Sequence, residues 1–189
     1  VFAGGYSPGV VNVIDYVEIT TVGNALDFGD LSEQGEALGT ATSPTRACFA
    51  GGRHPQTNEF IDYITMASTG DAIDFGDLSQ ARQNMCYHTS SSSTRGIFAG
   101  GIIPATVDTI DSITIASVGN ATDFGNLTEG RRLAFNVSTQ TRAVFAGGYN
   151  NVQSMDYITI ASAANAIDFG EMVGKRRFSG GACSDSHGG

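Results

Sequence analysis

One short motif, an aromatic residue followed by a small residue and two glycines, occurs four times in this chain. Its copies read VFAGGY at 1–6, CFAGGR at 48–53, IFAGGI at 97–102 and VFAGGY at 144–149. Successive copies start 47, 49 and 47 residues apart. Self-similarity at a fixed period of this length predicts that the 189 residues consist of four copies of one small unit.

Each unit contains further short segments with the pattern of β-strands. In the second unit, IDYITM at 61–66 alternates at period two, and IDFGDL follows at 73–78. A fourth segment, rich in small residues (GTATS at 39–43), leads directly into the next FAGG stretch. Four short segments separated by Gly, Asn, Ser and Pro predict one four-stranded antiparallel sheet per unit.

The order of the segments predicts how the sheets are arranged. We expect the small-residue segment to be the innermost strand, because strands crowded around a central axis leave little room for side chains. In the last unit this segment, 177–189, has no following unit. We therefore expect it to complete the sheet that begins at Val1 and to close a four-bladed β-propeller, which leaves no free sheet edge. This single domain spans 1–189, with repeats starting near 2, 49, 98 and 145, and we expect that it was cut from a longer chain.

Repeated Phe and Gly residues are predicted to shape the core. We expect eight Phe side chains to fill the space between neighbouring sheets, each stabilising the fold by about 1.5 to 3 kcal/mol when buried. The diglycines permit a sharp turn and a close approach of two backbones. The Gly-Asn and Gly-Asp steps at 23–24, 70–71 and 119–120 predict tight hairpins between the third and fourth strands. The Phe positions are Phe2, Phe49, Phe98, Phe145, Phe28, Phe75, Phe124 and Phe169.

Repeated carboxylates are predicted to be structural rather than catalytic. The spacing of DFGD does not match that of a calcium loop, so we expect the two Asp series to cap turns and to bind backbone groups. Arg46, Arg95 and Arg142 are expected to pair with these carboxylates. The Asp positions are Asp15, Asp62, Asp111 and Asp156, then Asp27, Asp74, Asp123 and Asp168.

Composition and the remaining polar residues argue against several functional classes. The net charge of −9 and the single lysine, Lys175, argue against a nucleic-acid partner. No apolar run of about 18 residues could span a membrane. The three cysteines have no CxxC spacing, so we expect buried thiols rather than a zinc site or a disulfide framework. They are Cys48, Cys86 and Cys183.

No catalytic motif is present, and we expect no enzymatic activity, no cofactor and no bound metal. Copper chemistry would need converging His, Tyr and Cys side chains. The chain has CYH at 86–88, but alternation along a strand would turn the Tyr away from the other two residues. His54 and His187 stand in unrelated local sequences.

The loops that follow the diglycines differ most between the repeats. They read YSPGVVN, RHPQTNEF, IIPATVD and YNNVQS, and loops of this kind commonly hold binding residues on a repeated scaffold. Exposure alone would explain the same variation. The candidate contact residues are Tyr6, Arg53, His54, Asn58 and Tyr149.

This pattern resembles the kelch repeat of galactose-oxidase-type β-propellers. The four diglycines match the kelch diglycine, and Tyr16, Tyr63 and Tyr157 match its third-strand tyrosine. The chain departs from the kelch pattern at Ser112, in the DFG Phe that replaces the outer-strand Trp, and in having four repeats where six or seven are usual.

The amino-acid sequence of the repeats, with IDYITIAS, GNAxDFGDL and CSDSHGG, is similar to that of kelch-like repeats in virion structural proteins of marine tailed bacteriophages. That resemblance implies an extracellular module of a tail fibre, tail tip or other appendage. Its partners would be other virion proteins and a host-surface glycan or protein. Two alternatives stay open: a carbohydrate-binding lectin propeller and, less favoured by the residues, a galactose-oxidase-like enzyme.

Overall fold

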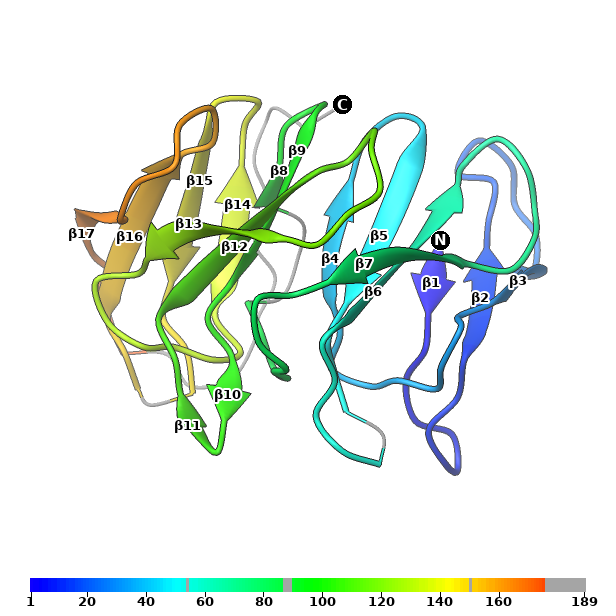
Figure 1. The fold of residues 1–189 in the computed structure, drawn as a ribbon, viewed down its shortest axis with the longest axis horizontal. Coiled ribbons are helices and arrows are strands. Elements are labelled where there is room, and N and C mark those ends of the chain that lie inside the picture. The colour runs from blue at the N-terminus through cyan, green and yellow to red at the C-terminus, as the bar shows by residue number, and fades with distance from the viewer. Residues whose placement is uncertain (54, 87–89, 150, 176–189) are drawn as a thin grey trace.

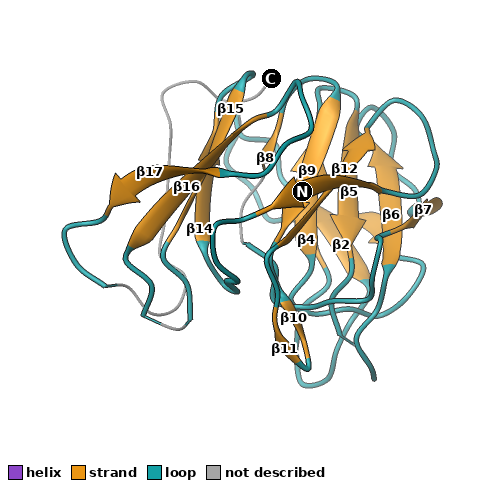
Figure 2. Cartoon of the chain, turned by 60° about the vertical axis from the view of Figure 1, so that its left-hand side comes forward, coloured by secondary structure: helices purple, strands orange, loops and turns teal. Residues whose placement is uncertain are grey.

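The chain forms antiparallel β-sheets. The computed structural model describes residues 1–53, 55–86, 90–149 and 151–175, and no helix occurs among them (Figure 2). Within those residues, therefore, no helix is long and apolar enough to cross a membrane. The expected all-β class and one antiparallel sheet per repeat are confirmed.

Among the described residues, three sheets have four strands and the first has three (Figure 1). The first sheet contains β1 (Phe2–Ala3), β2 (Val13–Tyr16) and β3 (Leu26–Asp30). The second contains β4 (Gly39–Thr42), β5 (Arg46–Ala50), β6 (Phe60–Thr65) and β7 (Ile73–Asp77). The third contains β8 (Ser90–Ser91), β9 (Arg95–Ala99), β12 (Thr109–Thr114) and β13 (Thr122–Asn126). The fourth contains β14 (Phe135–Ser138), β15 (Arg142–Ala146), β16 (Ser154–Thr159) and β17 (Ile167–Glu171). A small hairpin, β10 (Ile102–Ile103) and β11 (Ala105–Thr106), extends from the third sheet.

The DFG motif is a repeated β-bulge. In the second sheet Ile61 pairs with Gly76 and Asp62 pairs with Asp74, so that Phe75 is the extra residue between the two pairs. The same register shift occurs in the other three sheets. A bulge bends the strand and redirects a side chain, and here the extra residue is the Phe of the motif.

The diglycine allows a turn against a neighbouring segment. Gly51 and Gly52 have φ values of 61° and 92°, in the region that favours glycine. A Cβ atom at Gly51 would lie 2.5 Å from the carbonyl oxygen of Arg82, and the amide of Gly52 donates a 3.0 Å hydrogen bond to that oxygen. The predicted sharp turn and close backbone approach are both present.

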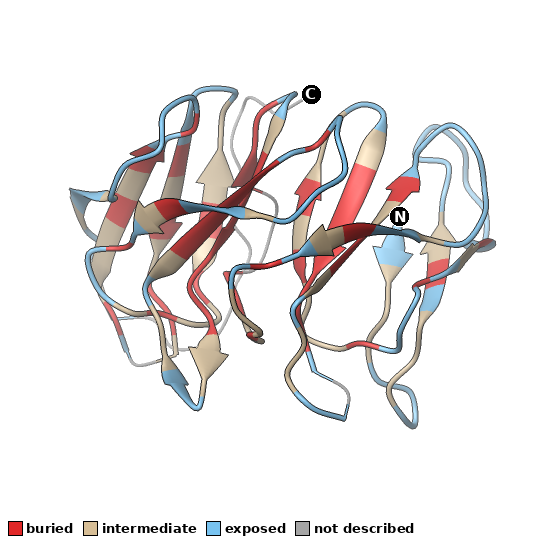
Figure 3. Cartoon of the chain, in the orientation of Figure 1, coloured by how far each residue is buried: buried red, intermediate tan, exposed pale blue. Residues whose placement is uncertain are grey.

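The four sheets follow one another in chain order (Figure 1). Each pair of successive sheets encloses one hydrophobic cluster, and burial concentrates on these shared faces (Figure 3). The small-residue strands β4, β8 and β14 contact one another in succession. The described residues form no closed ring, and the segment expected to complete the first sheet, 177–189, lies outside them.

The four sheets form a row, and burial of the repeated Phe residues differs from expectation in the first and last sheets of this row. The six inner rings are at most 6% exposed, whereas Phe2 is 62% and Phe169 is 48% exposed. The inner rings lie between two sheets, but each end ring lies on a sheet face that no other sheet of the described residues covers. The buried rings are Phe28, Phe49, Phe75, Phe98, Phe124 and Phe145.

The Gly-Asn and Gly-Asp steps do not form the expected tight hairpins. In the second sheet the chain turns earlier, where the amide of Ser68 donates to the carbonyl of Thr65. The segment 70–72 then runs along the outer strand of the preceding sheet, with the amide of Gly70 donating to the carbonyl of Phe28 at 2.7 Å. Pairing with the preceding sheet, rather than turn geometry, accounts for this sequence.

Candidate functional site

The variable loops all lie at the diglycine end of the sheets, the end from which β10 and β11 extend in Figure 1. Tyr6 is 69% exposed. Arg53 is exposed, and its Nε donates a 3.0 Å hydrogen bond to Oε1 of Glu36, with which it forms an ion pair. His54 lies outside the described residues.

The other two loop candidates are less available to a partner. Asn58 is partly buried; its amide donates to the carbonyl of Gly52, and its own carbonyl accepts from the amide of Arg82. Tyr149 is also partly buried, because the guanidinium of Arg132 stacks 3.9 Å from its ring centroid. The candidates come from loops of three different sheets and form no single cluster of side chains.

One hollow lies beside the Arg53 loop and was missed by sequence reasoning. It has a volume of about 610 Å³ and lies between that loop and the β10–β11 hairpin. Ile102, Ile103 and Pro104 give it an apolar wall, and Gln56 and Thr57 give it a polar wall. The run IIP, unlike the polar residues in the other three loops, was the signal in the sequence.

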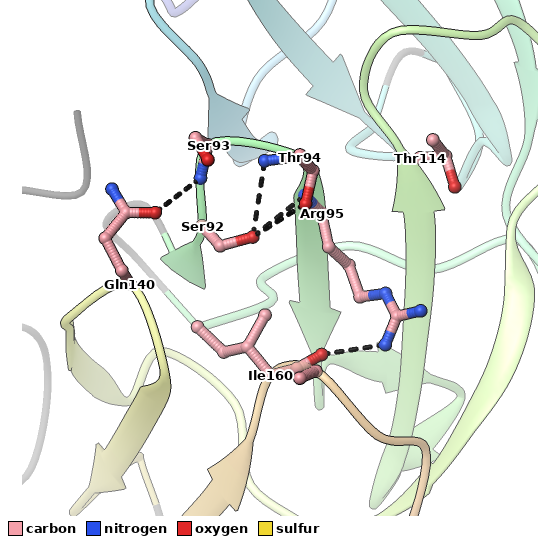
Figure 4. Close-up of a pocket in the computed structure, with 8 residues that line it drawn as sticks. Ser92, Ser93, Thr94, Arg95, Thr114, Gln140 and Ile160 are labelled. Atoms are coloured by element: carbon pink, nitrogen blue, oxygen red, sulfur yellow. Dashed lines mark hydrogen bonds between the residues drawn. The ribbon is translucent and has the colours of Figure 1, made fainter.

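A second hollow lies at the opposite end, where the third and fourth sheets meet (Figure 4). Its volume is about 330 Å³, within the range of roughly 300–1,000 Å³ typical of small-molecule sites. The turn at 92–94, the Arg95 side chain, Gln140 and Ile160 line it. Sequence reasoning did not predict a cavity at this place.

Hydrogen bonds hold the wall of this second hollow in place. Oγ of Ser92 accepts from the amides of Thr94 and Arg95, at 3.3 and 3.0 Å. Oε1 of Gln140 accepts from the amide of Ser93 at 2.7 Å. Nη1 of Arg95 donates to the carbonyl of Ile160 at 2.8 Å (Figure 4).

Two side-chain nitrogens in this hollow are not used by the protein itself. Within the described part of the chain, Nη2 of Arg95 and Nε2 of Gln140 have no hydrogen-bond partner. None of the eight lining residues is acidic. The hollow can therefore offer donors to a neutral or anionic ligand that is rich in oxygen atoms.

Buried Asp residues join successive sheets. Asp62 accepts hydrogen bonds from the amide and the hydroxyl of Ser32. Asp111 accepts from the amide of Ser79, and Asp156 from the amide of Thr128, at 3.0 Å in both cases. Each of these carboxylates thus holds the segment that arrives from the preceding sheet. The second Asp series binds backbone within its own strand, since Oδ1 of Asp74, Asp123 and Asp168 accepts from the amide two residues later.

The Arg partners of the buried carboxylates are not the predicted ones. Arg46 and Arg142 stack on Tyr63 and Tyr157, with the guanidinium carbon 4.3 and 4.4 Å from the ring centroid. Arg46 and Arg95 donate to the carbonyls of Ile115 and Ile160. In the second sheet, for example, Arg46 of β5 pairs with Thr65 at the end of β6, whereas Asp62 of β6 pairs with Phe49. The two positions are therefore separated along the strands.

Two other arginines make the buried ion pairs. Nη1 of Arg82 lies 2.8 Å from Oδ2 of Asp111, and Nη2 of Arg131 lies 3.0 Å from Oδ2 of Asp156, with all four side chains fully buried. Burial lowers the pKa of Arg82, while the Asp111 carboxylate acts in the opposite direction. Both pairs join sheets, and none of their four residues lines either hollow.

The described residues include two of the three cysteines and none of the histidines. Cys48 and Cys86 are buried free thiols, as predicted, and burial raises the pKa of each to about 12. Cys183 and the three histidines lie outside the described residues. No group of three or more His, Cys, Asp or Glu that could hold a metal ion occurs among residues 1–53, 55–86, 90–149 and 151–175.

Searches of known protein families and of curated proteins find no match to this chain.

Proposed function

We propose that this chain is a non-catalytic structural or receptor-contacting module of a bacteriophage particle, located on a tail fibre, tail tip or other appendage. Its partners in this proposal are other virion proteins and a glycan or protein on the host surface. The resemblance of the repeat sequences to marine phage virion proteins supports this assignment.

The observation that carries the proposal is the contrast between uniform junctions and unlike loops. The same backbone and carboxylate contacts join each pair of sheets. The four loops at the diglycine end differ in sequence, and the second and third of them line the 610 Å³ hollow. A rigid frame that presents variable loops suits recognition, because the loops can change without disturbing the core.

The finer architecture that we propose is a four-bladed kelch-like propeller closed through the two ends of the chain. The first sheet supports this proposal, because it has three strands where the others have four. The position without a strand lies beside β1 and corresponds to β4, β8 and β14. Residues 177–189, with the small-residue composition of those strands, would occupy this position.

Labelling of particles tests the proposed location. Antibodies raised against the purified chain should decorate an appendage in electron micrographs of the phage whose genome encodes it. Detection inside infected cells but not on purified particles would contradict the proposal.

Binding to host cells tests the proposed contact. The fluorescent chain should bind host cells, and Tyr6→Ala with Arg53→Ala should weaken this binding. Ile19→Ala, at an exposed position in the connection between β2 and β3 at the opposite end of the sheets, is the matched control. Equal binding by all three proteins would show that these loop residues make no contact.

A carbohydrate-binding function is the second candidate, and the hollow in Figure 4 favours it. Sugars present many oxygen acceptors, which suit the unused donors of Arg95 and Gln140. A glycan array should show selective binding that Arg95→Gln abolishes and Arg142→Gln, the equivalent change in the fourth sheet, does not. The absence of selective binding to any glycan would reject this candidate.

A further inference from the structure

A short segment of each later sheet is clamped to the outer strand of the sheet before it, and we call this contact a clasp. At the first junction the amide of Gly70 donates to the carbonyl of Phe28 at 2.7 Å, and the amide of Ala72 donates to the carbonyl of Asp30 at 2.8 Å. The side chain of Asp71 completes the clasp, since its Oδ1 accepts from the amide of Asp30 at 3.0 Å.

The clasp recurs at the other two junctions. At the second, Gly119 donates to Phe75 and Ala121 donates to Asp77, both at 2.7 Å, while Oδ1 of Asn120 accepts from the amide of Asp77 at 3.1 Å. At the third, Ala166 donates to the carbonyl of Asn126 at 2.8 Å, and Oδ1 of Asn165 accepts from the amide of Asn126 at 3.0 Å.

The glycine of the DFG motif makes room for the clasp. A Cβ atom at Gly76 would lie 2.6 Å from the backbone of Gly119, and the same conflict would arise at Gly29 and Gly125 with their own neighbours. Real Cβ atoms do not approach backbone so closely. The glycine is thus required where a clasp is present.

Among the described residues, each end of the row of sheets carries one half of a clasp that has no partner. Gly170 has the same motif and a φ of 123°, yet a Cβ there would meet no atom of the described residues within 4 Å. At the other end, Gly23, Asn24 and Ala25 repeat the Gly-Asn-Ala sequence of 119–121 and are all exposed. β17 therefore has the strand half, and residues 23–25 have the clamping half.

The exposed aromatic rings at the ends are also complementary. Across the first junction Phe49 and Phe28 belong to one hydrophobic cluster. At the second junction Phe98 and Phe75 share a cluster, and at the third junction Phe145 and Phe124 share another. Phe2 and Phe169 occupy the corresponding positions and are the two repeat rings that remain exposed.

We propose that residues 23–25 dock on β17 of the same chain and form a fourth clasp. Gly23 would donate to the carbonyl of Phe169, Ala25 would donate to the carbonyl of Glu171, and Asn24 would accept from the amide of Glu171. Phe2 and Phe169 would then bury each other. This contact rests on the proposed ring and adds an outer joint to the inner strand proposed for 177–189.

Docking within one chain is favoured over docking between two copies. The net charge of −9 makes copies repel one another, and a large net charge keeps proteins monomeric. Because both halves belong to one polypeptide, their docking is intramolecular and does not depend on protein concentration.

Cross-linking tests the fourth clasp. In a Cys183→Ser background, Asn24→Cys with Glu171→Cys is treated with a short bis-maleimide and analysed by denaturing gel and peptide mass spectrometry. Asn120→Cys with Asp77→Cys is the matched control, because that pair already faces across a clasp. Cys48 and Cys86 stay unreactive at neutral pH, since burial raises both thiol pKa values to about 12.

The expected result is a 24–171 link within monomers, in a yield comparable with that of the control. When the reaction is run in urea, which unfolds the chain, we expect much less of this link. Dimers linked through 24 and 171 would assign the surfaces to a second copy and overturn the proposal. Absence of a link where the control reacts would also overturn it. In that case a compact ring in solution X-ray scattering would leave the proposed propeller intact, whereas an extended particle would reject both.

Discussion

Nη1 of Arg82 donates a 2.8 Å hydrogen bond to Oδ2 of Asp111, and both side chains are fully buried. Nη2 of the same guanidinium donates to the carbonyl of Phe98 at 3.1 Å. Because Arg82 lies on the segment between the second and third sheets and Asp111 lies on β12, the pair fixes where that segment meets the third sheet.

Removal of either partner should strongly destabilise the chain. Arg82→Met would leave the Asp111 carboxylate buried without its counter-charge, and we expect a loss of about 3–5 kcal/mol in the free energy of unfolding. Urea denaturation measures this loss. Arg53→Ala, which breaks the more exposed ion pair with Glu36, is the control and should cost about 0–1 kcal/mol. A loss below 1 kcal/mol for Arg82→Met would show that the buried pair contributes little to holding the two sheets together.

The inner Phe residues should carry much of the packing energy. Phe75→Ala would empty a site that is 2% exposed, and we expect a loss of about 3–5 kcal/mol. Thermal or urea denaturation measures the loss. Val173→Ala, at a fully exposed position, is the control and should change stability by at most about 0.5 kcal/mol. Similar losses for the two variants would contradict the inter-sheet core.

The DFG glycine provides a paired test of the junctions. Gly76→Ala adds a methyl group against the backbone of Gly119 at a φ of 136°, so we expect a loss above the 1–3 kcal/mol that is roughly typical of backbone strain alone. Gly170→Ala has the same kind of φ without the contact in the described structure. With a fourth clasp the two losses in unfolding free energy should be equal; a smaller loss at Gly170 would indicate an open end.

Alkaline pH should weaken the fold through the buried thiols. Cys86 has a pKa raised from 9.0 to about 12, so the folded state keeps its proton after the unfolded state has released it. The contribution of Cys86 is fully present below pH 9 and is lost as the pH rises towards 12, by about 1.4 kcal/mol per pH unit. Urea denaturation between pH 8 and pH 10.5 measures this slope, and Cys86→Ala should reduce it. An unchanged slope in the variant would contradict the assignment.

The repeat spacing predicted the sheets because strand formation depends on local pattern. The alternation at 61–66 and the spacing of the diglycines were sufficient for four antiparallel sheets in the observed strand order. The clasps were not predicted, since a Gly-Asp step looks the same whether it turns within its own sheet or pairs with the preceding one. Only the position of Phe28 beside Gly70 distinguishes the two.

The ion pairs were missed for a related reason. Arg46, Arg95 and Arg142 repeat at regular positions, and for this reason they were predicted to pair with the repeated carboxylates. Arg82 and Arg131 have Gly35 at the corresponding position of the first repeat, so this position does not hold arginine in every repeat. Pairing of Arg82 with Asp111 joins residues 29 positions apart, which a strand pattern does not reveal. The two hollows likewise depend on how neighbouring sheets meet.

The distance between the two ends of the row tests the central claim most directly. Spin labels at Val22→Cys and Glu171→Cys would be compared, by pulsed electron paramagnetic resonance, with labels at Val118→Cys and Asp77→Cys, the equivalent positions across the second junction. A closed ring of four equivalent sheets predicts the same distance distribution for both pairs, independent of protein concentration. A clearly longer distance for the Val22 and Glu171 pair would contradict the ring.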